Sequence, residues 1–94
     1  MNYDYYIVKT YEYTGGGSSA NVRVSPLPGQ GISYKIKVEC SRSMRKEHPI
    51  GTLFKLKARL TNREGGTPFL YSRHDWEYEV VSEDEAKKYI KEHF

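Results

Sequence analysis

Hydrophobic and polar residues alternate along two segments of this 94-residue chain. From Ile32 to Cys40 every second residue is apolar, and the residues between them are Ser, Lys, Lys and Glu. Leu53 to Leu60 repeats the pattern, with two lysines and an arginine between its apolar residues. Because side chains of a strand alternate between two faces, each segment predicts a strand with one buried and one solvated face. On this pattern Tyr34 and Leu60 are expected to face the core.

Four further segments, rich in aromatic or β-branched residues, also predict strands: Tyr3–Tyr13, Asn21–Val24, Phe69–Ser72 and Trp76–Val81. The first is apolar on both faces, which predicts a central strand or one bent by a bulge. The last should carry its apolar residues, including Trp76, on one face and its two glutamates on the other. Glycine-rich turns are expected at 14–20 and around Gly65-Gly66.

The last 13 residues, Ser82–Phe94, predict an amphipathic helix. Ser82 and Glu85 match the capping box, and acidic residues fill the first turn as the helix dipole prefers. The apolar stripe of this helix should pack on the sheet. A single helical turn is also possible between Ser41 and Glu47, before Pro49 stops it.

A run of strands followed by one helix predicts a mainly β (α+β) fold in a single domain, 1–94. We expect five or six short antiparallel strands in 1–81, curled into a half-open barrel or strongly twisted sheet, with the helix in 82–94. On architecture alone, this arrangement resembles small curled β folds of the OB or SH3-like kind.

Composition limits the class of protein. The chain has one cysteine, so an internal disulfide is excluded and a cytoplasmic location is expected. Mean hydropathy is −0.78, which is polar for a folded domain of this length. No apolar window approaches the length of a membrane span, and the first residues lack the pattern of a secretion signal.

Charge is unevenly distributed along the chain. Between Arg23 and Arg63 there are ten basic and only two acidic side chains, whereas the rest of the chain is acidic. Lys35 and Lys37 point outward from one predicted strand, and the cations of Leu53–Leu60 point outward from another. If these strands are neighbours, their basic face would attract a polyanion. Cross-strand pairing with Glu77 and Glu79 could instead neutralise that face.

The leading hypothesis is therefore a small non-catalytic binding module that contacts nucleic acid. The candidate nucleic-acid-binding residues are Lys35, Lys37, Arg45, Lys55, Lys57, Arg59 and Arg73. Candidates for stacking or polar contacts are Tyr34, Tyr71 and His74. Exposed tyrosine rings beside cations would suit stacking on bases.

Two alternatives use other features of the chain. A protein-interaction module or homodimer is compatible with the small core and the tyrosine-rich first strand. A small enzyme would use the segment Tyr71–Asp75, which collects reactive residue types, although strand alternation separates neighbouring side chains. That segment is better explained as a turn, so no catalytic residue is assigned. Cysteine and histidine spacings match no compact zinc pattern, and neither a metal nor a cofactor is predicted.

Overall fold

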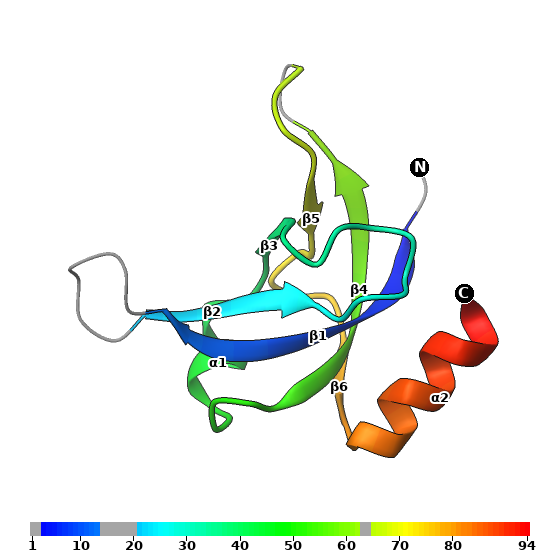
Figure 1. Cartoon of the computed structure of the whole chain (residues 1–94). Coiled ribbons are helices and arrows are strands. Elements are labelled where there is room, and N and C mark those ends of the chain that lie inside the picture. The colour runs from blue at the N-terminus through cyan, green and yellow to red at the C-terminus, as the bar shows by residue number, and fades with distance from the viewer. Residues whose placement is uncertain (1–2, 14–20, 63–64) are drawn as a thin grey trace.

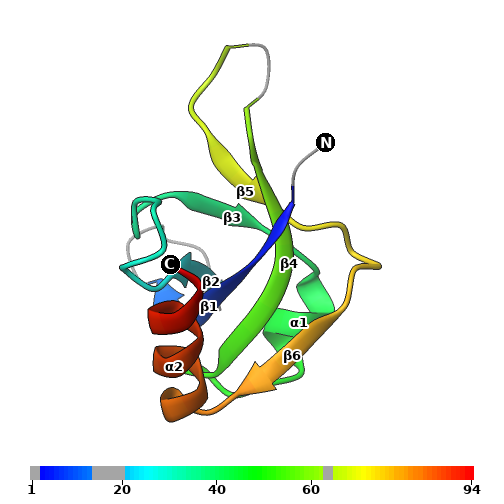
Figure 2. The same ribbon diagram turned by 90° about the vertical axis from the view of Figure 1, so that its right-hand side faces the viewer.

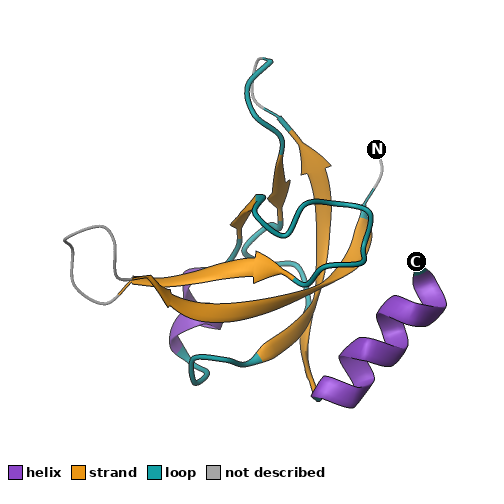
Figure 3. Ribbon diagram, viewed as in Figure 1, coloured by secondary structure: helices purple, strands orange, loops and turns teal. Residues whose placement is uncertain are grey.

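The computed structural model describes residues 3–13, 21–62 and 65–94. In chain order the elements are β1 (Asp4–Tyr13), β2 (Asn21–Pro26), β3 (Lys37–Glu39), α1 (Arg42–Lys46), β4 (Leu53–Thr61), β5 (Phe69–Tyr71), β6 (Tyr78–Val81) and α2 (Glu83–His93). Figures 1 and 3 show a strongly curled sheet with α2 at its side. The predicted fold class, a mainly β barrel-like sheet with one C-terminal helix, is confirmed. The predicted glycine-rich turn at 14–20 lies outside the described residues.

The sheet is a nearly closed barrel. Its strand order is β2-β1-β4-β5-β3, and β6 pairs with β4 beside this path. β2 and β3, the two ends of the order, lie against each other but are not hydrogen-bonded neighbours in the described structure. All strand pairs are antiparallel except β3 with β5, which is parallel. The chain between them contains α1 and β4, which is the long crossover that a parallel pair requires.

The barrel is filled from several elements. Val8 of β1, Val24 of β2, and Phe54 and Leu56 of β4 form one buried cluster. Met44 of α1 is fully buried in the same cluster, so this short helix closes one end of the barrel. The inward positions predicted for β4 from its alternation are therefore confirmed at its first half.

β1 lies between β2 and β4 in the strand order, and its middle is buried on both faces. Val8 points into the barrel, while Ile7 on the other face is also fully buried. The buried Gln30 side chain completes the strand edge there. Its Oε1 accepts a hydrogen bond from the Ile7 N–H (2.7 Å), and its Nε2 donates to the Ile7 carbonyl (2.9 Å). Of the two expectations for this strand, the central position is the one observed.

The C-terminal helix packs on the outside of the sheet, and α1 lies on the opposite side of β4 (Figure 2). The predicted capping box of Ser82 and Glu85 is present. Ala86 is fully buried, and the Tyr89 hydroxyl donates to the Tyr5 carbonyl at 2.7 Å. Gly29 has φ +95°, and a Cβ there would meet Ile90 at 3.3 Å. The absence of a side chain at Gly29 therefore permits close approach of the helix.

The strand predicted from Ile32 to Cys40 is wrong over most of its length, because β3 contains only Lys37–Glu39. Before it the chain turns: the Ile36 N–H donates to the Ser33 carbonyl at 3.2 Å. β3 pairs only with the three residues of β5. The residues before it alternate in polarity but have no strand to pair with in the described structure, so they do not form a strand. As a result Tyr34, predicted to face inward, is 55% exposed.

Two further details differ from the sequence pattern. Leu60, predicted to face inward, is 47% exposed, although its direct partner on β5, Leu70, is fully buried. The strand predicted at Trp76–Val81 begins only at Tyr78, and Val80 is 50% exposed on it. Trp76 instead follows a turn closed by its N–H and the Arg73 carbonyl at 3.1 Å.

Candidate functional site

The open side of the barrel contains a hollow of about 600 Å³. We call it the seam hollow, because it lies where β2 and β3 approach without pairing. Its lining comes from β1, β2, the turn before β3, β3 itself and α1: Tyr11, Arg23, Val24, Ser25, Tyr34, Lys35, Ile36, Lys37, Val38 and Arg45. Segments far apart in the sequence thus form one concave surface.

The seam hollow is basic. Its described lining includes four cations, Arg23, Lys35, Lys37 and Arg45, and no carboxylate. Arg23 is exposed on β2, between the inward-facing Val22 and Val24. Lys35 and Lys37 are exposed on the turn and on β3. Like charges at one concave surface repel each other and attract an anion.

Arg45 lies at the floor of the hollow and is half-buried. Its Nη1 donates to the Val22 carbonyl at 3.3 Å, which ties α1 to β2. Its Nε is buried without a hydrogen-bond partner in the described structure. The Arg45 charge opposes the effect of burial, which raises the pKa of the Cys40 thiol. Cys40 is therefore a neutral, half-buried thiol, as expected for a packing residue.

Two tyrosine rings are accessible beside these cations. Tyr11 is 42% exposed and Tyr34 is 55% exposed. The Lys35 ammonium lies 5.8 Å from the centre of the Tyr34 ring. A basic concave surface edged by accessible aromatic rings can bind phosphates and stack on bases at the same time.

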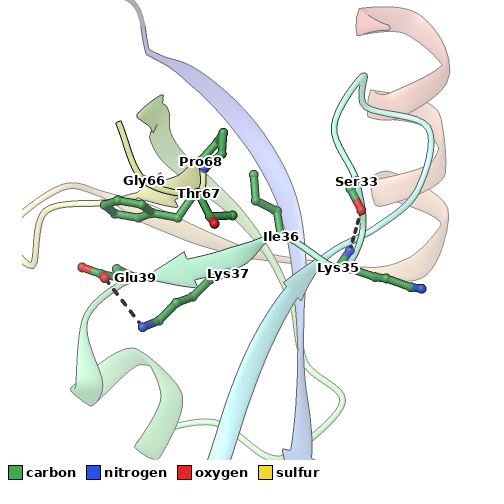
Figure 4. Close-up of a pocket in the computed structure, with 9 residues that line it drawn as sticks. Ser33, Lys35, Ile36, Lys37, Glu39, Gly66, Thr67 and Pro68 are labelled. Atoms are coloured by element: carbon green, nitrogen blue, oxygen red, sulfur yellow. Dashed lines mark hydrogen bonds and ion pairs between the residues drawn. The ribbon is translucent and has the colours of Figure 1, made fainter. Parts of the chain in front are cut away.

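A second hollow, the apolar slot, adjoins the first and has a volume of about 670 Å³. It is lined by Ser33, Lys35, Ile36, Lys37, Glu39, Gly66, Thr67, Pro68 and Phe69. In Figure 4, Ile36 lies across from Thr67 and Pro68, Lys37 runs toward Glu39, and Lys35 extends away. Lys35, Ile36 and Lys37 line both hollows, so they form the ridge between them.

The predicted basic face is divided by the strand order. β5 lies between β3 and β4, so the lysines before and on β3 are not beside those of β4. Lys35, Lys37 and Arg45 meet at the seam hollow. Lys55, Lys57 and Arg59 point outward from β4, as predicted, but on a different part of the barrel surface.

Aromatic rings cover the cations of β4. The Lys55 ammonium lies 4.5 Å from the centre of the Tyr89 ring and 5.6 Å from that of Tyr5. The Lys57 ammonium lies 4.0 Å from Tyr3 and 5.2 Å from Trp76. The Arg59 guanidinium lies 5.6 Å from the ring centre of Tyr71. We call Lys55, Lys57, Arg59 and these five rings the cation–aromatic ladder.

Acidic β6 also neighbours the ladder. Glu79 is directly opposite Lys55 in the β4–β6 register, and Glu77, Glu79 and Lys55 line a common hollow. This is the pairing geometry that the sequence offered as a route to neutralise the basic face. The ladder therefore combines ring contacts with nearby carboxylates, whereas no carboxylate is among the described residues that line the seam hollow.

The segment Tyr71–Asp75 is the end of β5 followed by a turn. Arg73 contacts Asp75 through Nε (3.1 Å) and Nη2 (3.2 Å), on an exposed surface. The Ser72 hydroxyl is buried and donates to the Lys57 carbonyl at 2.6 Å. His74 is exposed. These contacts agree with a structural turn and do not assemble a nucleophile with a base.

Arg23 and Tyr11 belong to the seam hollow but were not among the candidates from sequence. Arg23 stands between Val22 and Val24, so strand alternation already gave it an outward direction. Tyr11 is its direct partner across the β1–β2 pair. The outward direction of Arg23 could therefore be predicted, but the strand predicted at Asn21–Val24 gave no reason to place Arg23 near Lys35.

Other classes of site have little support in the described part of the chain. No group of three His, Cys, Asp or Glu side chains there is placed to hold a metal ion. No helix among these residues is long and apolar enough to cross a membrane. Comparison with protein-family models, curated proteins and solved structures found no match for this chain.

Proposed function

We propose that this chain is a small non-catalytic module that binds single-stranded nucleic acid along the seam hollow. One observation carries the proposal: four cations from β2, the turn before β3, β3 and α1 converge on one concave surface whose described lining has no carboxylate. A polyanion is the ligand class that such a surface favours.

The two exposed tyrosines of the hollow favour nucleic acid over other polyanions. Tyr11 and Tyr34 are accessible at the same hollow as the cations. Base stacking on an aromatic ring contributes about 1–3 kcal/mol per base and requires an unpaired base. Arg23, Lys35 and Lys37 would contact phosphates, while Tyr34 would offer its ring to a base.

The connectivity supports the same location. β1 pairs with both β2 and β4, β3 pairs in parallel with β5, and α1 lies between β3 and β4. This agrees with the OB arrangement, in which the face of the second and third strands and the adjoining loops bind oligonucleotides or oligosaccharides. Since one fold serves many functions, this agreement supports the place of the site, and the charges support the ligand class.

Fluorescence anisotropy of a labelled single-stranded oligonucleotide tests the proposal. Binding should be measurable at about 50 mM salt and should weaken steeply toward about 200 mM, because phosphate contacts release counterions. A duplex of the same sequence should bind less well, since its bases are not available for stacking. Lack of binding to the single strand even at the lower salt concentration would overturn the proposal.

An assembly module is a second candidate, and β6 is the feature that favours it. Among the described strands β6 pairs only with β4, which leaves its other edge open. Val80 on this strand is 50% exposed, and Ile50 is 53% exposed. An open apolar edge can pair with another chain. Light scattering separates the candidates, because a monomer over a wide range of concentrations argues against assembly through β6.

A further inference from the structure

Arg45 differs from the other cations of the seam hollow in its depth and in its unused donors. It is half-buried at the floor, whereas the other three cations that line the hollow are exposed. Among the described residues its guanidinium makes one hydrogen bond, from Nη1 to the Val22 carbonyl at 3.3 Å, and its buried Nε has no partner. A guanidinium has five N–H donors, so most of them are unused. A planar fork of donors held in a basic hollow suits a phosphate group.

We propose that the seam hollow binds the terminal phosphate of a nucleic-acid strand, and that Arg45 distinguishes this phosphomonoester from an internal phosphodiester. The proposal rests on the function proposed above, because the other cations and the tyrosines of the hollow must hold the nucleotides next to the end. It names the part of the strand that the site recognises and the residue that recognises it.

The size of the hollow favours the end of a strand over its middle. Its volume of about 600 Å³ is in the range of small-molecule sites, about 300–1,000 Å³. The surface with which an OB fold holds a strand along its length covers about 4–16 nucleotides. The hollow is thus closer in size to a site for a small ligand, such as the last nucleotide of a strand, than to such a surface.

The depth of Arg45 points to the same part of the strand. An internal phosphate carries a nucleotide on each side, so both nucleotides must enter the hollow before that phosphate can reach the floor. A terminal phosphate is attached on one side only, and it can extend to the floor while its nucleotide stays at the rim. Tyr11 and Tyr34 are exposed at the hollow and can stack on the base of that nucleotide.

Charge separates the two kinds of phosphate further. A phosphomonoester carries about −1.5 to −2 charges near pH 7 and has three acceptor oxygens, whereas a phosphodiester carries a single charge. Four cations and no carboxylate are among the described residues that line the hollow. The more highly charged end of the strand is therefore the favoured ligand, and the fork of Arg45 can donate to two of its oxygens.

Competition between unlabelled strands, measured by fluorescence anisotropy at low salt, tests the proposal. Three competitors of one sequence carry a 5′-phosphate, a 3′-phosphate or a hydroxyl at both ends. Wild-type protein should bind one phosphorylated strand at least about tenfold more tightly than the hydroxyl-ended strand, the effect expected of one charge-assisted hydrogen bond. The other phosphorylated strand adds the same charge at the end that does not enter the hollow, so its gain should stay below about threefold.

A conservative substitution tests the role of Arg45. Arg45→Lys keeps the charge but removes the fork, so the preference for the phosphorylated end should fall below about threefold. The affinity for the hydroxyl-ended strand should change little. Arg42→Lys is the matched control, because Arg42 is exposed on the same helix and is not among the residues that line the hollow. This variant should keep the full preference.

The outcomes separate this inference from the proposed function. Equal binding of the three strands by wild-type protein would overturn recognition of the end and leave nucleic-acid binding intact. An equal gain from both phosphorylated ends would also overturn it, because charge alone would then explain the gain. A preference that survives in Arg45→Lys would overturn the role of Arg45. Failure of every strand to bind at low salt would remove the proposed function and this inference together. The wild-type comparison requires no variant to fold.

Discussion

Two basic regions of this molecule come from the same basic stretch of sequence but differ in what surrounds their charges. At the seam hollow, Lys35 and Lys37 are exposed beside Arg23 and Arg45, and no described carboxylate lines the surface. On the cation–aromatic ladder, Lys57 lies between two aromatic rings. The cations of the first region converge on one concave surface, whereas those of the second each lie against one or two aromatic rings from other parts of the chain.

The difference shows that a count of cations does not locate a binding surface. A lysine over aromatic rings remains charged, but its attraction to the rings already fixes its position. Glu79, opposite Lys55 in register, adds a local carboxylate. We therefore expect substitutions in the seam hollow to change affinity, and substitutions in the ladder to change stability.

The largest expected effect is on ligand affinity. Lys35→Ala combined with Lys37→Ala should weaken single-strand binding by at least about a hundredfold at low salt, since each charged contact contributes about 1.5–3 kcal/mol. Unfolding by urea should be almost unchanged, because both side chains are exposed. Anisotropy and urea titration measure the two effects. An affinity within threefold of wild type would show that the ridge does not hold phosphates.

A smaller effect is expected on the stability of the domain when the buried side chain of Gln30 is removed. Gln30→Ala should lower the free energy of unfolding by about 2 kcal/mol, because it leaves the buried N–H of Ile7 without its partner, whereas the Ile7 carbonyl keeps the Leu27 N–H at 3.0 Å. The same side chain donates to the Leu27 carbonyl at 2.8 Å. Urea denaturation measures the change. A loss below about 0.5 kcal/mol would mean that water replaces these bonds without cost.

We expect the ring contacts of Lys57 in the cation–aromatic ladder to contribute about 1 kcal/mol to the free energy of unfolding. Lys57→Ala removes cation–π contacts with Tyr3 and Trp76, each of which contributes about 0.5–1 kcal/mol at an exposed site. In a domain of this size, that corresponds to a fall in Tm of about 4–8 °C. Lys35→Ala is the matched control and should lower Tm by less, because it removes a single, longer contact, at 5.8 Å from the Tyr34 ring. Equal Tm shifts in the two variants would contradict the distinction between the regions.

The smallest effect is expected at Arg73. Its ion pair with Asp75 is exposed on both sides, and such pairs contribute about 0–1 kcal/mol. Arg73→Ala should therefore change Tm only slightly. Its role in nucleic-acid binding stays a prediction from sequence, and anisotropy with the same variant tests it. A loss of affinity as large as that of Lys35→Ala would extend the interface to this turn.

Local patterns predicted much of the fold. The outward lysines of β4, the capping box of α2 and the helical turn of α1 each depend on residues close in sequence. The strand predicted at Ile32–Cys40 was wrong because its alternation was clear but its partner, β5, is only three residues long. Pairing partners, unlike alternation, are set by the whole chain.

The candidate site was only partly predictable for the same reason. Lys35, Lys37 and Arg45 were identified from charge, and the structure gathers them at one hollow. The parallel pairing of β3 with β5 separates them from Lys55, and the sequence pattern did not predict that pairing. Tyr34 was a candidate for stacking from the sequence, but it is accessible at the hollow because the chain turns before β3.

The salt dependence of binding tests the distinction between the two regions most directly. Lys35→Ala/Lys37→Ala and Lys55→Ala/Lys57→Ala remove the same charge at the same spacing. The slope of log affinity against log salt should fall in magnitude by about 1.4 in the first variant, or about 0.7 per lost phosphate contact. In the second variant the slope should match that of wild type. Equal changes of slope in the two variants would contradict the account.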